Sequence, residues 1–142
     1  MLAQNYARTY RTNSVLTASP GQLVLMLYDG ALKALALAGE AFNRPPDDFR
    51  RIATINEQLL KAQSIIGELQ STLNLEAGDG QLAREMDRLY DYYIRKLMEA
   101  NMRKEPGPVK EVERLLSDLR DGWAEMLNKH DSPRTESVRS VA

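Results

Sequence analysis

The sequence predicts an all-α protein, an antiparallel four-helix bundle, and three observations support that prediction. First, apolar residues recur at helical spacing in four segments, whereas no run alternates with the period of two that is typical of β-strands. Second, short breaker clusters separate the four segments: "RPPDD" at 44–48, "AGDG" at 77–80 and "EPGPV" at 105–109. Third, connections this short return the chain beside the preceding helix, so consecutive helices should run antiparallel.

The first helix, predicted over about 20–43, has a clear start. Ser19 is a good N-cap residue, Pro20 suits the first helical position, and Gln22 completes a capping box. The cap, the proline and the glutamine together indicate that the bundle begins at about residue 19, which leaves residues 1–18 as a separate N-terminal arm.

The same helix is apolar around most of its circumference. Between residues 23 and 42 the charged residues are Asp29, Lys33 and Glu40, which fall on one narrow stripe. Two explanations are compatible with this pattern: the helix is the most central of the four, or part of its apolar surface is kept for another chain. A membrane span would have the right length of roughly 20 residues, but a lysine in mid-segment argues against it.

The other three helices have one apolar side each. The second, about 48–74, carries a seam that repeats every seven residues, and the fourth, about 108–128, has a similar seam that includes Trp123 and is assigned to the core. The third, about 81–103, has a wider apolar arc opposite a charged side. Residues 19–128 therefore form the predicted bundle, preceded by a mobile arm and followed by a polar tail, 129–142, that is predicted to be disordered.

Composition excludes several classes of function. The 142 residues include no cysteine and one histidine, and the net charge is −1. Thiolate metal sites, thiol catalysis, disulfides and a basic nucleic-acid surface are therefore excluded. The histidine, His130, has no Glu-x-x-His partner, and no glycine cluster precedes the Lys-Ser/Thr of a phosphate loop. We expect no enzyme, no metal and no cofactor, and the absence of a signal peptide predicts a cytoplasmic protein.

Four stretches carry a resemblance to a known family: "NSVLTASPGQLVLMLYDGALKALALA", "LLKAQSIIGELQSTLN", "LYDYYIRKLMEANMRK" and "VKEVERLLSDLRDGWAEML". In this order and spacing they closely resemble the flagellin-specific export chaperones of bacteria, the FliS family. The resemblance runs from about Tyr6 to Leu127. Departures are confined to the 44–48 loop, the "GDG" turn and the C-terminal tail.

The resemblance implies a four-helix bundle that binds newly made flagellin in the cytoplasm. The target would be flagellin's C-terminal segment, which is disordered in the monomer, and binding would block premature polymerisation and keep the subunit competent for the flagellar type III export apparatus. Export-gate components are further expected partners, and no nucleotide or metal is implied. The alternatives are a chaperone for another flagellar secreted protein, a helical-bundle adaptor, or a structural homodimer; the protein itself is expected to be a monomer or a weak homodimer.

The resemblance and the apolar pattern together suggest partner-binding residues in the arm and in three helices. In the arm, two tyrosines would act as a lid and two aliphatic residues as its hinge-side contacts. For all of these candidates except the arm tyrosines, ordinary core packing is at least as good an explanation, whereas the two residues of the second helix are candidates because the core does not obviously need them. The candidates are Tyr6, Tyr10, Val15 and Leu16 in the arm, Leu23, Leu27 and Tyr28 in the first helix, Leu60 and Ile65 in the second, and Tyr90, Tyr93, Ile94 and Leu97 in the third.

Overall fold

The computed structural model describes the backbone of residues 19–141 and the side chains of residues 19–129. Four helices account for this part of the chain: α2 Pro20–Phe42, α3 Arg51–Ser71, α4 Gln81–Arg103 and α5 Pro106–Val141. No strand occurs among the described residues. The all-α fold class predicted from the sequence is therefore confirmed.

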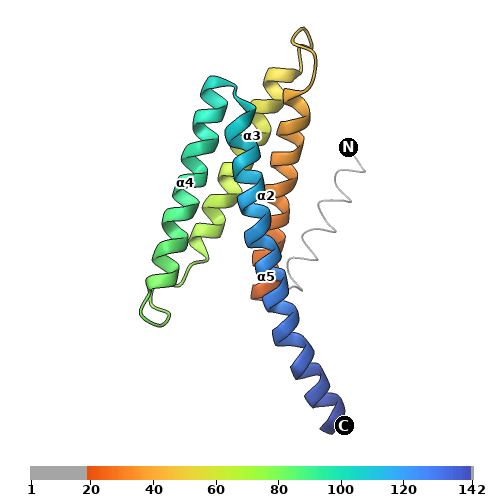
Figure 1. Ribbon diagram of the computed structural model, residues 1–142, viewed down its shortest axis with the longest axis vertical. Coiled ribbons are helices and arrows are strands. Elements are labelled where there is room, and N and C mark those ends of the chain that lie inside the picture. Colours follow the sequence, from red (N-terminus) through yellow and green to blue (C-terminus); the bar gives the residue numbers. More distant parts are fainter. Residues whose placement is uncertain (1–18, 142) are drawn as a thin grey trace.

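The helices form an up-and-down bundle in which neighbours in the chain are also neighbours in space (Figure 1). α2 packs on α3 and on α5, α3 packs on α4, and α4 packs on α5, so the four helices close into a ring. α2 makes the most extensive of these contacts and α4 makes fewer. The faces formed by α2 with α5 and by α3 with α4 consequently lie on opposite sides of the bundle.

Local chemistry fixes where helices α2 and α4 begin. The Gln22 amide donates to the Ser19 hydroxyl at 3.2 Å, and Pro20 occupies the first helical turn, as the sequence predicted. α4 follows a tight turn in which Gly80 has a φ of 75°. A Cβ at this position would collide with the Leu75 carbonyl oxygen, so this turn requires glycine.

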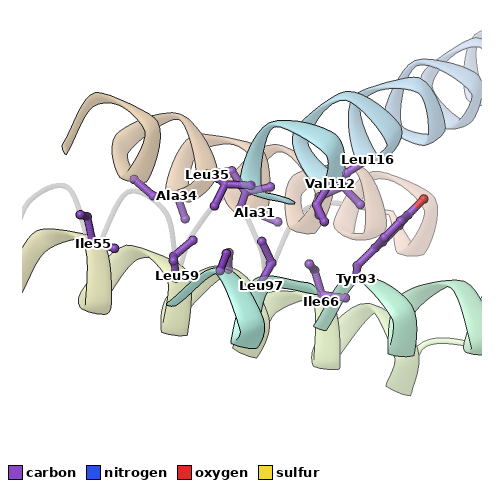
Figure 2. Close-up of a cluster of buried hydrophobic side chains, with 14 of the residues drawn as sticks. Ala31, Ala34, Leu35, Ile55, Leu59, Ile66, Tyr93, Leu97, Val112 and Leu116 are labelled. Atoms are coloured by element: carbon purple, nitrogen blue, oxygen red, sulfur yellow. The ribbon is translucent and has the colours of Figure 1, made fainter. Parts of the chain in front are cut away.

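The core runs along the bundle axis and receives apolar side chains from all four helices. α2 contributes mainly alanines on its inner face, which allow α3 and α5 to approach closely, whereas α3, α4 and α5 contribute larger side chains. Figure 2 shows these groups facing one another across the axis. The labelled core residues are Ala31, Ala34, Leu35, Ile55, Leu59, Ile66, Tyr93, Leu97, Val112 and Leu116.

The apolar character of α2 follows from its position between two partners. Its buried side chains point toward both α3 and α5, and other apolar residues, including Val24, Leu27 and Leu32, pack partly buried against the core. By length and composition alone α2 could cross a membrane, with a mean hydropathy of 1.3 over the best window, but a core helix passes the same test. Central packing therefore accounts for the buried part of α2, while several of its other apolar side chains are only half-buried.

Helix α5 continues beyond the rest of the bundle. Its backbone is helical to Val141, whereas the sequence predicted the fourth helix to end near residue 128 and a disordered tail to follow. Figure 1 shows this continuation extending past the ends of the other helices. Because helical hydrogen bonds are local, a helix can continue beyond the part that is packed on its neighbours.

Candidate partner-binding surface

The structure divides the helical candidates into three groups, while the four arm candidates lie outside the described residues. Of the first group, Tyr28, Tyr90, Tyr93 and Leu97 are buried in the core. A partner cannot reach these side chains while the helices remain packed as they are. We therefore assign them to the interior, which is the core-packing explanation that the helical pattern left open.

The buried tyrosines form a polar contact across the bundle. The hydroxyls of Tyr28 on α2 and Tyr90 on α4 lie 2.5 Å apart, and the rings of Tyr90 and Tyr93 pack edge to face with centroids 6.4 Å apart. Burial raises the pKa of Tyr28 and of Tyr90, and raises the pKa of Tyr93 to about 12. All three hydroxyls are consequently neutral at physiological pH, as an apolar interior requires.

The second group of candidates is half-buried. Leu27, Ile65 and Ile94 pack against the core from its edges, and Leu23 is also half-buried. The Ile65 side chain lies against Gly30, where its Cδ1 would be 3.5 Å from an added Cβ. Ile65 therefore serves the packing of α3 on α2, while Ile94 remains accessible at the outer edge of α4.

The third group is the exposed candidate Leu60, which shares one face of the bundle with two exposed methionines of α4. Leu60 of α3 is 58% exposed, and on α4 Met98 is 49% and Met102 is 79% exposed. Large apolar side chains this open to water are candidates for burial by a partner. We call Leu60, Ile94, Met98 and Met102 the α3–α4 surface.

Hydrogen bonds at both ends of the α3–α4 contact fix its register. The Lys104 ammonium donates to the side-chain oxygen of Asn56, and the Gln70 amide donates to a carboxylate oxygen of Asp91 at 2.8 Å. These pairs hold the two helices antiparallel, with Leu60, one turn after Asn56, level with the stretch between Met98 and Met102. Leu60 and the two methionines are about forty positions apart in the sequence. The register of the two helices brings them to the same part of the surface.

The polar side chains along the α3–α4 contact recur at heptad spacing. Asn56, Gln63 and Gln70 follow one another every seven residues on α3. The outer two bond to α4, whereas the Nε2 of Gln63 is buried without a hydrogen-bond partner among the described residues. A buried amide nitrogen without a hydrogen-bond partner costs about 1–3 kcal/mol of stability. An acceptor placed beside the Gln63 Nε2 would remove that cost.

Lys104 ends α4 in an unusual conformation that positions this polar network. Its φ of 53° is in the left-handed region, and its ammonium also donates to the Asn101 carbonyl oxygen at 2.7 Å and to the Asn101 side-chain oxygen at 2.5 Å. Burial lowers the pKa of Lys104. The lysine therefore closes the helix end and joins it to α3.

The sequence identifies Met98 and Met102 as flexible apolar residues suited to a folding ligand, although they are not among the candidate site residues. Met98 lies at the edge of the wide apolar arc of α4, and Met102 lies one turn further on, beside the charged side of this helix. That pattern was available in the sequence, but it does not reveal which side of α4 a neighbouring helix covers. Among the described residues no group of His, Asp or Glu could hold a metal ion.

Comparisons with known proteins identify the family of this chain. A family model described as "Flagellar protein FliS" matches residues 2–130. The flagellar secretion chaperone FliS of Bacillus subtilis is 42% identical over 134 residues, which cover 94% of this chain and 95% of that protein. The FliS proteins of Salmonella typhimurium and Escherichia coli are 38% and 35% identical, each over 125 residues that cover 87% of this chain and 88% of the relative.

The family match includes α2, α3, α4, the connections between the helices and α5 as far as residue 130, and the identities are well above those that indicate fold alone. The resemblance found in the sequence motifs is thereby confirmed over nearly the whole chain. This protein belongs to the FliS family, whose characterised members are flagellar secretion chaperones.

Proposed function

We propose that this protein is a cytoplasmic chaperone that binds the disordered C-terminal segment of flagellin, blocks its premature polymerisation and keeps it competent for the flagellar type III export apparatus. The observation that carries the proposal is the α3–α4 surface, with its exposed Leu60, Met98 and Met102, on a member of the FliS family. Relatives that are 35–42% identical are named flagellar secretion chaperones.

The chemistry of the α3–α4 surface suits a segment that folds as it binds. An amphipathic helix can lay its apolar side along an exposed apolar row, and flexible methionines adapt to different side chains. Ordering the segment costs roughly 2–5 kcal/mol, which burial of apolar surface at about 25 cal/mol per Å² must offset.

The arm keeps its predicted role within this proposal. Tyr6 and Tyr10 would act as a lid, with Val15 and Leu16 as hinge-side contacts, and flagellin would displace the arm. Deleting residues 2–12 should alter affinity for flagellin and leave the circular-dichroism signal of the bundle almost unchanged. Loss of the helical signal on deletion would contradict the lid role.

Binding at the α3–α4 surface is tested by calorimetric titration with a flagellin C-terminal fragment. Leu60→Ser and Met98→Ser should each weaken binding about tenfold while the melting temperature changes little. Phe49, which is 85% exposed in the loop between α2 and α3, provides the control, because Phe49→Ser removes an exposed apolar group away from the proposed surface. Equal effects of all three substitutions would reject this surface, and no binding by the unmodified protein would reject flagellin as the cargo.

The same titration separates the cargo from its alternative. Tails of hook-associated proteins should bind more weakly than the flagellin fragment, and the reverse order would make this protein a chaperone for another flagellar secreted protein. Release would follow from competition with export-gate components, without nucleotide or metal. The cytosolic location is checked by fractionation of cells, where recovery with membranes in the absence of cargo would contradict it.

A further inference from the structure

Three Asp–Gly dipeptides occur in the chain: Asp29–Gly30, Asp79–Gly80 and Asp121–Gly122. In such a dipeptide the amide nitrogen of the glycine can attack the side-chain carboxyl carbon of the aspartate, and one water leaves as a five-membered succinimide forms. Glycine allows this attack because it has no Cβ to obstruct the approach and restricts the backbone least. The reacting atoms are the same in all three dipeptides, so their surroundings decide which of them reacts.

Hydrolysis of the succinimide gives one of two products. Water that opens one carbonyl group restores aspartate. Water that opens the other gives isoaspartate, in which the backbone runs through the former side chain and the former backbone carboxyl group becomes a free carboxylate. The water lost in the first step is regained in the second, so the reaction needs no oxidant, reductant or other co-reactant.

Two of the dipeptides lie inside helices, Asp29–Gly30 in α2 and Asp121–Gly122 in α5. A helix holds the aspartate ψ at about −42°, and the amide of each following glycine belongs to the hydrogen-bond ladder. Arg120 also donates to both carboxylates, at 2.8 Å to Asp29 and at 3.4 Å to Asp121. The attack at either place therefore requires a break in a helix.

The third dipeptide lies in the turn between α3 and α4. Asp79 is exposed, and Gly78 and Gly80 have φ values of 57° and 75°, in the left-handed region. The Asp79 carboxylate accepts from the Gln81 amide at 3.0 Å, and the Gly80 amide donates to the Ala77 carbonyl oxygen at 2.9 Å. These are separate turn bonds, so either can break without the loss of a helical ladder.

The turn is held by few contacts, and most of them face water. The Arg84 guanidinium donates to the Asp79 carbonyl oxygen at 3.1 Å, and the Leu75 carbonyl oxygen lies against Gly80. Turns and helix ends open locally at a small free-energy cost, whereas the interior of a packed helix opens with the whole element. The Gly80 nitrogen therefore reaches the Asp79 carboxyl carbon more often than the corresponding atoms meet within α2 or α5.

We propose that Asp79–Gly80 is the site at which this protein forms isoaspartate, and that the product is a substrate for an L-isoaspartyl methyltransferase. This class of enzyme transfers a methyl group from the sulfonium of S-adenosylmethionine to the isoaspartyl carboxylate, and the sulfonium becomes a neutral thioether. The Gly80 nitrogen then attacks the methyl ester, methanol leaves, and hydrolysis of the renewed succinimide returns part of the chain to aspartate. The exposed turn leaves the carboxylate accessible to such an enzyme.

Isoaspartate changes the start of α4. The link adds a methylene group to the backbone between Asp79 and Gly80 and moves the carboxylate away from the Gln81 amide. It also displaces the carbonyl oxygen that Arg84 contacts. The first turn of α4 should consequently open more often, while Met98, about 25 Å further along the helix, keeps its place on the α3–α4 surface.

Peptide mapping of the aged full chain tests the proposal. The protein is incubated at mildly acidic pH, where part of the carboxyl groups are protonated and can lose water, and isoaspartate is labelled with an L-isoaspartyl methyltransferase and radioactive S-adenosylmethionine. Label should accumulate at Asp79 about tenfold faster than at Asp29 or Asp121, because local opening is easier in the turn. In guanidinium chloride, where the helices are lost, the three sites should be labelled at similar rates.

Two substitutions give the matched comparison. Asp79→Ser keeps an oxygen that can bond the Gln81 amide but cannot form a succinimide, so it should abolish the label in the turn. Asp121→Ser makes the same change in a helical dipeptide and should leave the total label almost unchanged. Hydrogen exchange at the Arg84 amide, which donates to the Gly80 carbonyl oxygen at 3.0 Å, should be faster in the aged protein than in the fresh protein.

The outcomes are decisive in both directions. Equal labelling of the three aspartates in the folded protein would overturn the proposal, because the turn would then confer no selectivity. It is also overturned if Asp79 stays unlabelled in the folded protein while the unfolded chain is labelled there, or if Asp79→Ser gives as much label as the unmodified protein.

Discussion

Helices α2 and α4 have the same length, 23 residues, but opposite character. α2 is apolar nearly all the way round, whereas α4 has a wide apolar arc and a charged side. In the structure, the more apolar helix is the better covered of the two. The large apolar side chain that α2 leaves exposed is Met26, whereas α4 leaves Leu82, Met98 and Met102 exposed.

The difference arises from the number and closeness of neighbours. α2 packs extensively on α3 and also on α5, so two sides of this helix are covered, and its alanines let both neighbours approach. α4 packs less extensively on its two neighbours, and its methionines remain at the edge of the contact with α3. The higher apolar content of α2 therefore matches the larger area that its neighbours cover. On α4 the apolar arc is wider than α3 and α5 cover, and the uncovered part is the candidate partner surface.

The strongest test of this comparison pairs a buried residue of α2 with an exposed one of α4. Leu35→Ala should lower the free energy of unfolding by about 3 kcal/mol, because it leaves a cavity in a fully enclosed site. Met102→Ala should change it by less than about 0.5 kcal/mol. Urea denaturation measures both, and similar losses at the two positions would show that α4 is covered as fully as α2.

The sequence was sufficient to predict the four-helix bundle, but it predicted the α3–α4 surface only in part. Helical spacing and breaker clusters predicted four helices, and the starts of α2 and α4 agree with the structure to the residue, because capping and turn chemistry are local. Periodicity also defined the apolar arc of α4. It could not separate Tyr93, which is enclosed, from Met98, which is exposed, because that depends on where α3 and α5 lie against the arc.

The tyrosines where α2 meets α4 predict a loss of stability in alkali. Tyrosines in the unfolded chain lose their protons near pH 10, whereas burial raises the pKa of Tyr93 to about 12. Stability is therefore complete below pH 10 and falls as the pH rises toward 12, by about 2–3 kcal/mol for this residue alone.

Urea midpoints measured between pH 8 and pH 11.5 should follow this decline. Tyr93→Phe should flatten the upper part of the curve, because phenylalanine has no proton to lose. A midpoint that stays constant to pH 11.5 in the unmodified protein would contradict the enclosure of these hydroxyls.

The hydroxyl pair between Tyr28 and Tyr90 gives a smaller effect that tests how the two helices are coupled. Tyr28→Phe leaves the Tyr90 hydroxyl buried without its partner, which should cost about 1–2 kcal/mol. Replacing both tyrosines by phenylalanine removes the unpaired group as well, so the double variant should lose less than the sum of the single losses. A double-mutant cycle in urea measures this coupling, and strict additivity would mean that the hydroxyls do not interact.

The helix starts provide the smallest and most local contrast. α2 begins with the Ser19 hydroxyl accepting from the Gln22 amide, whereas α4 begins at Gly80, which has no side chain to cap it, with Asp79 accepting from the Gln81 amide at 3.0 Å. Ser19→Ala should cost about 1 kcal/mol and Asp79→Ala a few tenths, because an N-cap side chain bonds an amide that otherwise has no partner within the helix.

Thermal unfolding measures the two losses, and hydrogen exchange locates them. Ser19→Ala should speed exchange in the first turn of α2 without affecting α4, since frayed ends open locally. Equal losses from both substitutions would contradict the assignment of the stronger cap to α2. Protection that stays unchanged at Gln22 in Ser19→Ala would show that packing against α5, where the Trp123 indole nitrogen bonds the Gly21 carbonyl oxygen at 2.9 Å, holds this end without the cap.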